Sequence, residues 1–389
     1  MTKKYIIYIW IVLFVFSCQS LKEKNEEVAV VEIDIHNTQK HTISEFIDSV
    51  RFIKLETSDD CLIKFITNVS FDNNKIIIAG VSQKQVLVFN DEGAFINKIH
   101  RVGQGPGEYL DIARVLYDSV NKNIIIRAAP RKIQYYTLDG TLIREIPRFS
   151  ENAIIRDIIN LPNGNFLCYT HDLSPEDVGD KASGLWEVDF EGNFVRSIFT
   201  SHKFPVFLNL DNSKFQLLPD NKIKLTDAVT NDIYYLEDDT LRKVISHEIK
   251  NDISPSLIGL TTTDKKYIKI STCQEKEGYF FTYWSDDTES YYSVYSKKTN
   301  KNILVNSETL WETFDAVKPT ITNFAFKDNN RFDILVTALY GETIMDYLNA
   351  ENNNSQEIKN RLREVIEGMS EKEILDMNPV LQLLYVKKE

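Results

Sequence analysis

The chain has 389 residues, and its 57 acidic side chains against 45 basic ones give a formal net charge of −12. This acidic balance excludes a protein that binds nucleic acid through a broad basic footprint. Hydrophobic residues form 43% of the chain, ample for a sizeable core, and 22 Phe and 18 Tyr against 4 Met favour strands over helices.

The first residues have the layout of a secretory signal peptide. Two lysines precede the apolar run Tyr5–Phe16, which is too short to span a bilayer by itself. The run ends in the letters VFSC, which resemble a bacterial lipobox, and the alternative is an ordinary signal peptide beside an unrelated cysteine. We predict a signal peptide over residues 1–17, lipidation of Cys18, and a polar tether over residues 18–42 that forms no domain of its own.

A pattern of four short strands recurs five times along the middle of the chain. In each unit the last two strands are joined by a polar turn. These turns are Asn90–Gly93, Leu138–Gly140, Glu191–Asn193, Glu237–Asp239 and Lys297–Asn300. Four-stranded units that recur roughly every 50 residues predict the blades of a β-propeller, with a solenoid as the alternative.

A Gly-rich stretch, Arg101–Tyr109 (RVGQGPGEY), separates the first two units. Its three glycines and one proline exclude a continuous helix or strand. A phosphate-binding loop would continue with Gly-Lys-Ser/Thr, and the following LDIARV does not. We therefore interpret the stretch as a structural loop. The residues predicted to shape it are Gly103, Gly105, Pro106 and Gly107.

The end of the chain predicts ring closure. A sixth unit begins with two strands, Ile321–Phe326 and Phe332–Val336, and continues with a helical insert at about residues 341–377. The strand Val380–Val386 follows, so one strand is missing. The alternating segment Val50–Glu56 supplies it, and both free edges disappear when it pairs with the C-terminal strand. The predicted fold is an all-β six-bladed propeller of four-stranded blades, closed by N- and C-terminal strands, with a helical insert in the last blade.

These features resemble six-bladed β-propeller lipoproteins of Gram-negative bacteria, which are related in architecture to NHL-repeat and TolB-type propellers. The segments that carry the resemblance are Asp48–Thr57, Val88–Gly93, Gly103–Tyr109 and Asn378–Leu381, within residues 43–389. The resemblance implies a lipid anchor in the outer membrane, with the propeller facing the periplasm or the cell surface. It implies no particular ligand.

One face of such a propeller carries the loops between blades and those between the second and third strands. The long insertions of this chain gather there, which is typical of the binding face of a repeat protein. The candidate binding residues on that face are Glu108, Tyr109, Arg131, His171, Asp172, Trp284 and Asp286. We expect a glycan, a peptide or an envelope protein as the partner, in addition to the membrane reached through the anchor.

Two alternatives are a metal-dependent lactonase or lyase in the propeller tunnel and a structural scaffold of an envelope complex. The innermost predicted strands offer Asn68, Arg114, Asp157, Gln216, Lys269 and Asn323. This mixed set has few of the carboxylates that a calcium site needs, and no His-Glu-x-x-His or Gly-x-Ser-x-Gly motif is present. The sequence requires no cofactor, calcium stays open, and binding is favoured over catalysis.

The cysteines add one open question. Cys168 and Cys273 fall in apolar strand segments and are predicted to be small buried side chains. A disulfide among Cys61, Cys168 and Cys273 would be permitted outside the cytoplasm, and the sequence does not assign one.

Overall fold

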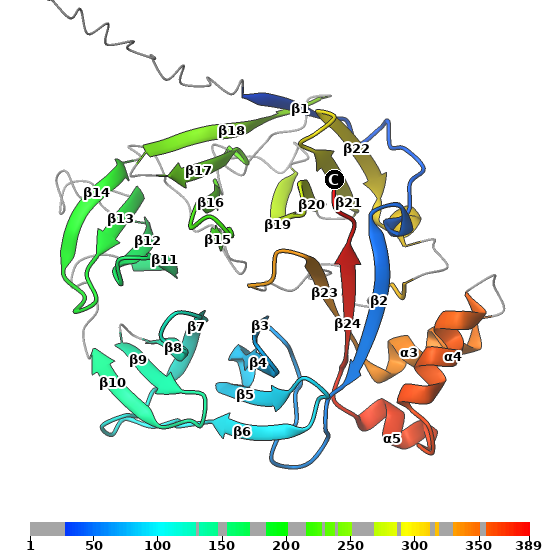
Figure 1. Cartoon of the computed structure of the whole chain (residues 1–389), viewed down its shortest axis with the longest axis horizontal. Coiled ribbons are helices and arrows are strands. Elements are labelled where there is room, and N and C mark those ends of the chain that lie inside the picture. The colour runs from blue at the N-terminus through cyan, green and yellow to red at the C-terminus, as the bar shows by residue number, and fades with distance from the viewer. Residues whose placement is uncertain are drawn as a thin grey trace, which may run out of the picture.

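The strands of the computed structural model form six sheets that stand around a central axis (Figure 1). The residues that the structure describes are 28–129, 132–146, 154–171, 184–200, 215–227, 230–237, 240–250, 268–285, 289–311, 316–318, 330–350 and 355–389. In each of blades one to five, four strands follow one another from the axis outward in the order of the chain, and blade four carries one further strand at its rim. The protein is therefore a six-bladed β-propeller, as predicted.

Blades one to three are regular four-stranded sheets. Blade one contains β3 (Asn68–Asp72), β4 (Lys75–Gly80), β5 (Gln85–Asn90) and β6 (Phe95–Ile99). Blade two contains β7 (Asp111–Asp118), β8 (Asn123–Ala129), β9 (Lys132–Thr137) and β10 (Leu142–Ile146). Blade three contains β11 (Ile154–Asn160), β12 (Phe166–His171), β13 (Gly184–Val188) and β14 (Phe194–Thr200).

Blades four to six complete the ring. Blade four contains β15 (Phe215–Leu217), β16 (Ile223–Thr226), β17 (Ile233–Glu237), β18 (Thr240–Ile249) and the added β1 (Ala29–Ile33). Blade five contains β19 (Lys269–Lys276), β20 (Tyr279–Ser285), β21 (Ser290–Ser296) and β22 (Lys301–Asn306). The described strands of blade six are β23 (Ile334–Leu339), β24 (Val380–Val386) and β2 (Ile47–Lys54). The predicted strand Ile321–Phe326 lies outside the described residues.

The predicted turns between the third and fourth strands share one hydrogen-bonding pattern in blades one to three. In blade one, Asn90 N–H donates to the carbonyl of Ala94 at 2.9 Å, and Gly93 N–H donates back to Asn90 at 3.1 Å. Gly93 adopts a φ of +91°, which a glycine reaches without steric cost. Asp189 and Gly192 repeat the arrangement in blade three, so the turn chemistry read from the sequence sets the blade geometry.

Ring closure occurs through the two predicted segments. Strand β2 pairs antiparallel with β24, with Lys54 opposite Val380, and it forms the outer edge of blade six. The closure is fastened to blade one, because the N–H of Glu56 donates to the carbonyl of Gly93 at 2.8 Å.

The predicted tether over residues 18–42 requires a correction. Its residues Ala29–Ile33 form β1, which pairs in parallel with β18 and places Val31 opposite His247. Val31 and Ile33 are buried against the side chains of blades four and five. The apolar alternation of this short segment therefore adds a fifth strand to blade four rather than forming part of a polar linker.

The core consists of apolar layers between neighbouring blades. Alternate residues of a strand face opposite sides of its sheet, so each blade packs against the blade before it and the blade after it. Ile77 and Val88 of blade one, for example, share a buried cluster with Ile124 and Ile126 of blade two. This arrangement leaves the ring centre to the side chains of the innermost strands.

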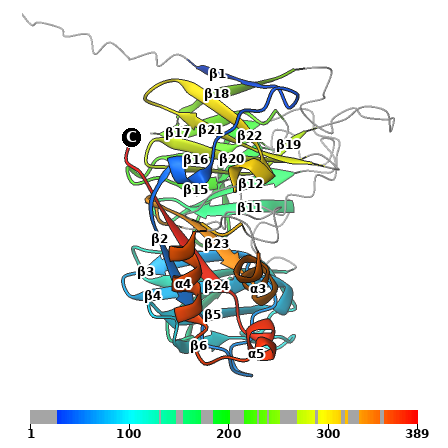
Figure 2. The same cartoon turned by 90° about the vertical axis from the view of Figure 1, so that its right-hand side faces the viewer.

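The helices occupy two places beside the last blades. A one-turn helix, α2 (Ser307–Leu310), follows blade five. The described residues also contain two 3₁₀ turns, η1 (Ile43–Glu45) before β2 and η2 (Val81–Gln83) between β4 and β5. The helices of the predicted insert are α3 (Gly341–Asn349), α4 (Gln356–Val365) and α5 (Glu371–Asp376), and they lie outside blade six (Figures 1 and 2). Helix α4 contacts the edge strand β2, where the Arg361 guanidinium lies 5.5 Å from the centre of the Phe52 ring. The insert thus covers the edge strand β2.

None of the helices in the described residues has the length and apolar character needed to cross a membrane. The thiols of Cys61, Cys168 and Cys273 are all buried and free, so these three residues form no disulfide in this structure.

Candidate functional site

The Gly-rich loop closes around its own carboxylate, Glu108. The N–H of Gly105 donates to Oε2 of Glu108 at 2.8 Å. A Cβ atom on Gly103 would lie 2.0 Å from the same oxygen. Two of the three glycines therefore make room for Glu108 and bind it, rather than forming an open anion site.

Tyr109 anchors the loop in the core. Its side chain is 1% exposed, and its hydroxyl donates to the carbonyl of Lys84 at 2.9 Å. The N–H of Tyr109 donates to the carbonyl of Arg101 at 2.9 Å, which closes the two ends of the loop onto each other. Burial raises the pKa of the Tyr109 hydroxyl, so this group stays a neutral donor.

The same loop fastens blade one to blade two. Gly107 N–H donates to Oε2 of Glu145 at 3.2 Å, and Lys132 Nζ donates to the carbonyl of Glu108 at 2.7 Å. Burial alone would raise the pKa of Glu145, but hydrogen bonds from Gln134 and Lys132 outweigh it and lower the pKa. These contacts support the structural role predicted for the loop.

The other predicted binding residues do not gather around this loop. Trp284 lies in β20, is fully buried, and donates its indole N–H to Oγ of Ser293 at 2.8 Å. His171 is the last residue of β12. Arg131, Asp172 and Asp286 lie outside the described residues, as does Cys18. Of the predicted binding residues whose side chains the structure describes, Glu108 and Tyr109 lie together in the loop, and Trp284 has a packing role.

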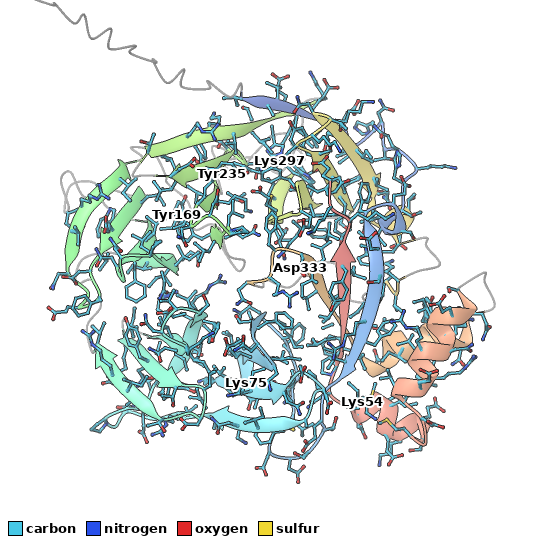
Figure 3. All side chains as sticks on the ribbon, viewed as in Figure 1. Lys54, Lys75, Tyr169, Tyr235, Lys297 and Asp333 are labelled. Atoms are coloured by element: carbon cyan, nitrogen blue, oxygen red, sulfur yellow. The ribbon has the colours of Figure 1, made fainter. Side chains whose placement is uncertain are left out.

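A cavity of about 410 Å³ lies at the ring centre, toward which side chains project from the surrounding blades (Figure 3). Its wall consists mainly of the innermost strands β3, β7, β11, β15 and β19 and the turns that follow them. Strand β7 starts beside the Gly-rich loop and ends beside Ser119, which lines the cavity. The cavity therefore extends toward the face opposite the loop.

Side-chain amides dominate the polar part of the wall. Those that line the cavity are Asn68, Asn160, Gln216, Asn221, Gln274 and Asn330. Gln216 accepts from the N–H of Glu275 and donates to its carbonyl, both at 2.8 Å. Asn330 forms the same pair of bonds with Phe71, again at 2.8 Å, and Asn68 donates to a carbonyl of blade two at 3.1 Å. These three amides therefore join neighbouring blades.

Four of the six residues weighed as tunnel metal ligands have protein partners in the described structure. Arg114 faces Asp157 across blades two and three, with Nε and Oδ1 3.4 Å apart. Asn68 and Gln216 are two of the amides that join blades, and Asn323 lies outside the described residues. In the described part of the chain no three His, Cys, Asp or Glu side chains are placed to hold a metal ion.

A second group of polar side chains on the wall has no such partner. The hydroxyl of Ser70 and the amides of Asn160 and Asn221 make no hydrogen bond within the described structure. Ser70 is only 7% exposed. These three side chains line the cavity and bind no other described residue, so this part of the wall is the candidate site.

The chain matches known proteins both in a family model and in its fold. Residues 27–385 match the model of the family described as "Domain of unknown function (DUF4934)". The chain belongs to this family. No curated protein sequence matches it.

Several solved structures are similar to this DUF4934 protein at low sequence identity. A Bacteroides fragilis protein that carries the name "Putative exported protein" matches with a TM-score of 0.75 and 18% identity, over 92% of this chain and 100% of that one. A DUF4221 member from Bacteroides vulgatus matches with a TM-score of 0.48 and 10% identity, over 88% and 98% of the two chains. Virginiamycin B lyase from Staphylococcus aureus matches with a TM-score of 0.42 and 10% identity, over 86% of this chain and 99% of that one. Of these three, the first supports the fold, and none defines a function.

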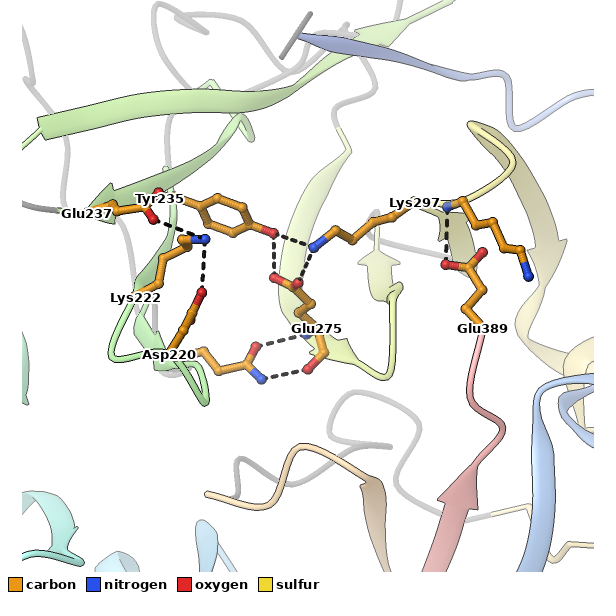
Figure 4. A network of polar contacts seen from close by, with 9 residues as sticks. Asp220, Lys222, Tyr235, Glu237, Glu275, Lys297 and Glu389 are labelled. Carbon is orange, nitrogen blue, oxygen red and sulfur yellow. Dashed lines mark hydrogen bonds and ion pairs between the residues drawn. The ribbon is translucent and has the colours of Figure 1, made fainter. Parts of the chain in front are cut away.

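A network of charged and polar side chains around the buried Glu275 lies between blades four and five of the DUF4934 protein, next to the cavity wall (Figure 4). The Tyr235 hydroxyl donates to Oε2 of Glu275 at 2.7 Å, and Lys297 Nζ donates to Oε1 at 2.8 Å. On the other side of the Tyr235 ring, Lys222 lies 3.0 Å from a carboxylate oxygen of Asp220. Burial raises the pKa of the Tyr235 hydroxyl far above its ordinary range.

Sequence reasoning missed this network, because its members come from separate strands and turns. Gln216 links it to the cavity, since the backbone of Glu275 is its partner. Both carboxylate oxygens of Glu275 are occupied by protein donors, so the network supports the joint between the blades.

Proposed function

We propose that this DUF4934 protein is an exported, lipid-anchored binding protein that holds a small ligand in its central cavity. The observation that carries the proposal is the set of unpaired polar side chains on the cavity wall. Asn160 is partly exposed and Asn221 is exposed, so these side chains can donate to and accept from a molecule that enters the cavity. The cavity volume of about 410 Å³ falls within the usual range for ligand pockets.

The proposed location follows from the leader. A basic start, a short apolar run and Cys18 fit a lipidated exported protein, and the similar Bacteroides fragilis protein carries a name that agrees with export. We place the anchor in the outer membrane, with the propeller facing the periplasm or the cell surface. Replacement of Cys18 by Ala should move the protein from the membrane fraction to the soluble fraction, and an unchanged distribution would contradict the anchor.

The loop-rich face is the proposed contact for a larger partner, such as an envelope protein. A small ligand fits the cavity better, because Ser70, Asn160 and Asn221 line it without binding another described residue. At the Gly-rich loop, by contrast, Glu108 and Tyr109 already bind protein atoms.

A blocking variant tests the cavity. Ser119 lines its rim, whereas the next residue, Val120, is 83% exposed and takes no part in the wall. In a thermal-shift and calorimetric screen of oligosaccharides and short peptides, Ser119→Trp should weaken any binding at least tenfold. Val120→Trp is the matched control and should bind as the wild type does. Equal binding by both variants would place the ligand elsewhere.

A further inference from the structure

We infer that the central cavity binds a neutral saccharide, recognised by Ser70, Asn160 and Asn221. This inference rests on the proposed binding function and names the ligand class of the same site. It follows from three properties of the wall: its charge, its unpaired polar groups and its apolar surface.

The cavity wall offers no unpaired charge among the described residues. Arg114 is the one charged residue among the described residues that line it, and its guanidinium faces the carboxylate of Asp157 at 3.4 Å. An anionic ligand or a free peptide terminus would need a charged partner, because burial of an uncompensated charge is costly. The wall therefore favours a ligand without formal charge.

The unpaired groups match the hydrogen-bonding chemistry of sugar hydroxyls. A serine hydroxyl and an asparagine amide each donate and accept, and so does every hydroxyl of a saccharide. Ser70 lies on β3, Asn160 ends β11, and Asn221 follows β15. Blades one, three and four therefore present these groups from separate sides of the cavity, as recognition of a ring with hydroxyls around its edge requires.

Apolar side chains supply the remaining surface. Leu217 is 42% exposed and lines the cavity, and Phe332 lines it with a partly exposed ring. Saccharide rings carry C–H groups on their faces, and these pack against such side chains while the hydroxyls bind the amides. A wall that combines neutral amides with aliphatic and aromatic surface is therefore suited to a sugar.

The test uses the full-length mature protein and defined probes. The neutral probes are maltohexaose, cellohexaose, xylohexaose, chitohexaose and mannohexaose. The comparison probes are an oligogalacturonate, a heparin-derived oligosaccharide and trialanine, all measured by isothermal titration calorimetry. We expect at least one neutral saccharide to bind, with affinity lowered at least tenfold in Asn160→Leu. Asn37→Leu is the matched control, since Asn37 is exposed and does not line the cavity, and it should leave affinity unchanged.

The outcomes separate this inference from the proposed function. Binding of only the anionic probes or trialanine, abolished by Ser119→Trp, would overturn the neutral-saccharide inference and keep the cavity as the site. Saccharide binding that Asn160→Leu does not alter, at an unchanged melting temperature, would also overturn the inference. If no probe binds in a manner sensitive to Ser119→Trp, the proposed function fails together with the inference. A variant that fails to fold is replaced by Asn221→Leu, for which the same tenfold loss is expected.

Discussion

The Gly-rich loop and the central cavity lie toward opposite ends of strand β7, and their polar groups differ in one respect. In the loop, the carboxylate of Glu108 and the hydroxyl of Tyr109 both bind backbone groups of the protein. On the cavity wall, Ser70 and Asn160 have no protein partner within the described part of the chain. The most conspicuous motif of the sequence is therefore a structural clamp, while the groups free to bind a ligand are ordinary residues from separate blades.

The largest expected effect comes from the loop. Gly107 has a φ of +75°, and a Cβ atom there would lie 2.9 Å from a methyl carbon of Leu142. Gly107→Val should lower the free energy of unfolding by at least about 2 kcal/mol, because a β-branched residue is strained in this conformation and also meets blade two. Urea denaturation measures the loss.

A substitution at a second glycine separates the backbone strain from the steric contact with blade two. Gly164 has a φ of +86°, and a Cβ atom there would have no described neighbour within 4 Å, so Gly164→Val carries the conformational strain alone. We expect it to cost about 1–2 kcal/mol, less than Gly107→Val. An equal loss in both variants would show that the contact with blade two contributes nothing.

An effect of intermediate size on stability is expected at His247, a buried group that has a hydrogen-bond partner. His247 lies against Trp284, with ring centres 4.9 Å apart, and its Nδ1 lies 2.7 Å from the carbonyl of Asn231. Burial lowers the pKa of His247 to about 4, although the Asn231 carbonyl and Asp232 oppose the shift. The unfolded chain, with a pKa near 6.5, therefore binds more protons between these values, and stability falls as the pH falls from 6.5 toward 4.

A comparison of variants isolates the contribution of His247 to the pH dependence of stability. Between pH 7.5 and pH 5, His247 should account for a loss of about 2 kcal/mol, measured as the difference between wild type and His247→Gln. His36→Gln, at an exposed position, should keep the wild-type pH dependence. Ligand affinity should not change over this range, because Ser70, Asn160 and Asn221 do not titrate. A His247→Gln protein that loses stability in acid as steeply as the wild type would contradict the argument.

Much of the ring could be predicted from sequence because its information is local and repeated. Turns such as Asn90–Gly93 and alternating strands such as β2 specify blades and closure without knowledge of distant contacts. Strand β1 could not be found this way, since its partner β18 is far along the chain and five residues of alternation also fit a linker. Trp284 lies in a strand rather than in the expected loop because β20 extends to Ser285.

The candidate site was beyond sequence reasoning for a different reason. Ser70 and Asn160 are single polar residues on separate strands, and nothing in their local sequence distinguishes them from surface residues. Only the ring geometry brings them to one cavity. The same geometry gives Asn68 and Gln216 inter-blade partners, so residue type alone does not separate a binding amide from a structural one.

The smallest expected effect on stability provides the sharpest comparison, because two buried serines differ in whether they have a partner. Ser293 is 2% exposed and accepts the indole N–H of Trp284 at 2.8 Å, so Ser293→Ala leaves a buried donor unpaired. It should cost about 1–3 kcal/mol and leave ligand affinity unchanged. Ser70→Ala removes a hydroxyl that has no partner among the described residues, so its cost should stay below about 0.5 kcal/mol while affinity for the cavity ligand falls. Urea denaturation and calorimetry on both variants measure the two quantities. If Ser70→Ala were as destabilising as Ser293→Ala and bound ligand normally, Ser70 would be a structural residue like Glu108, and the distinction between loop and cavity would not hold.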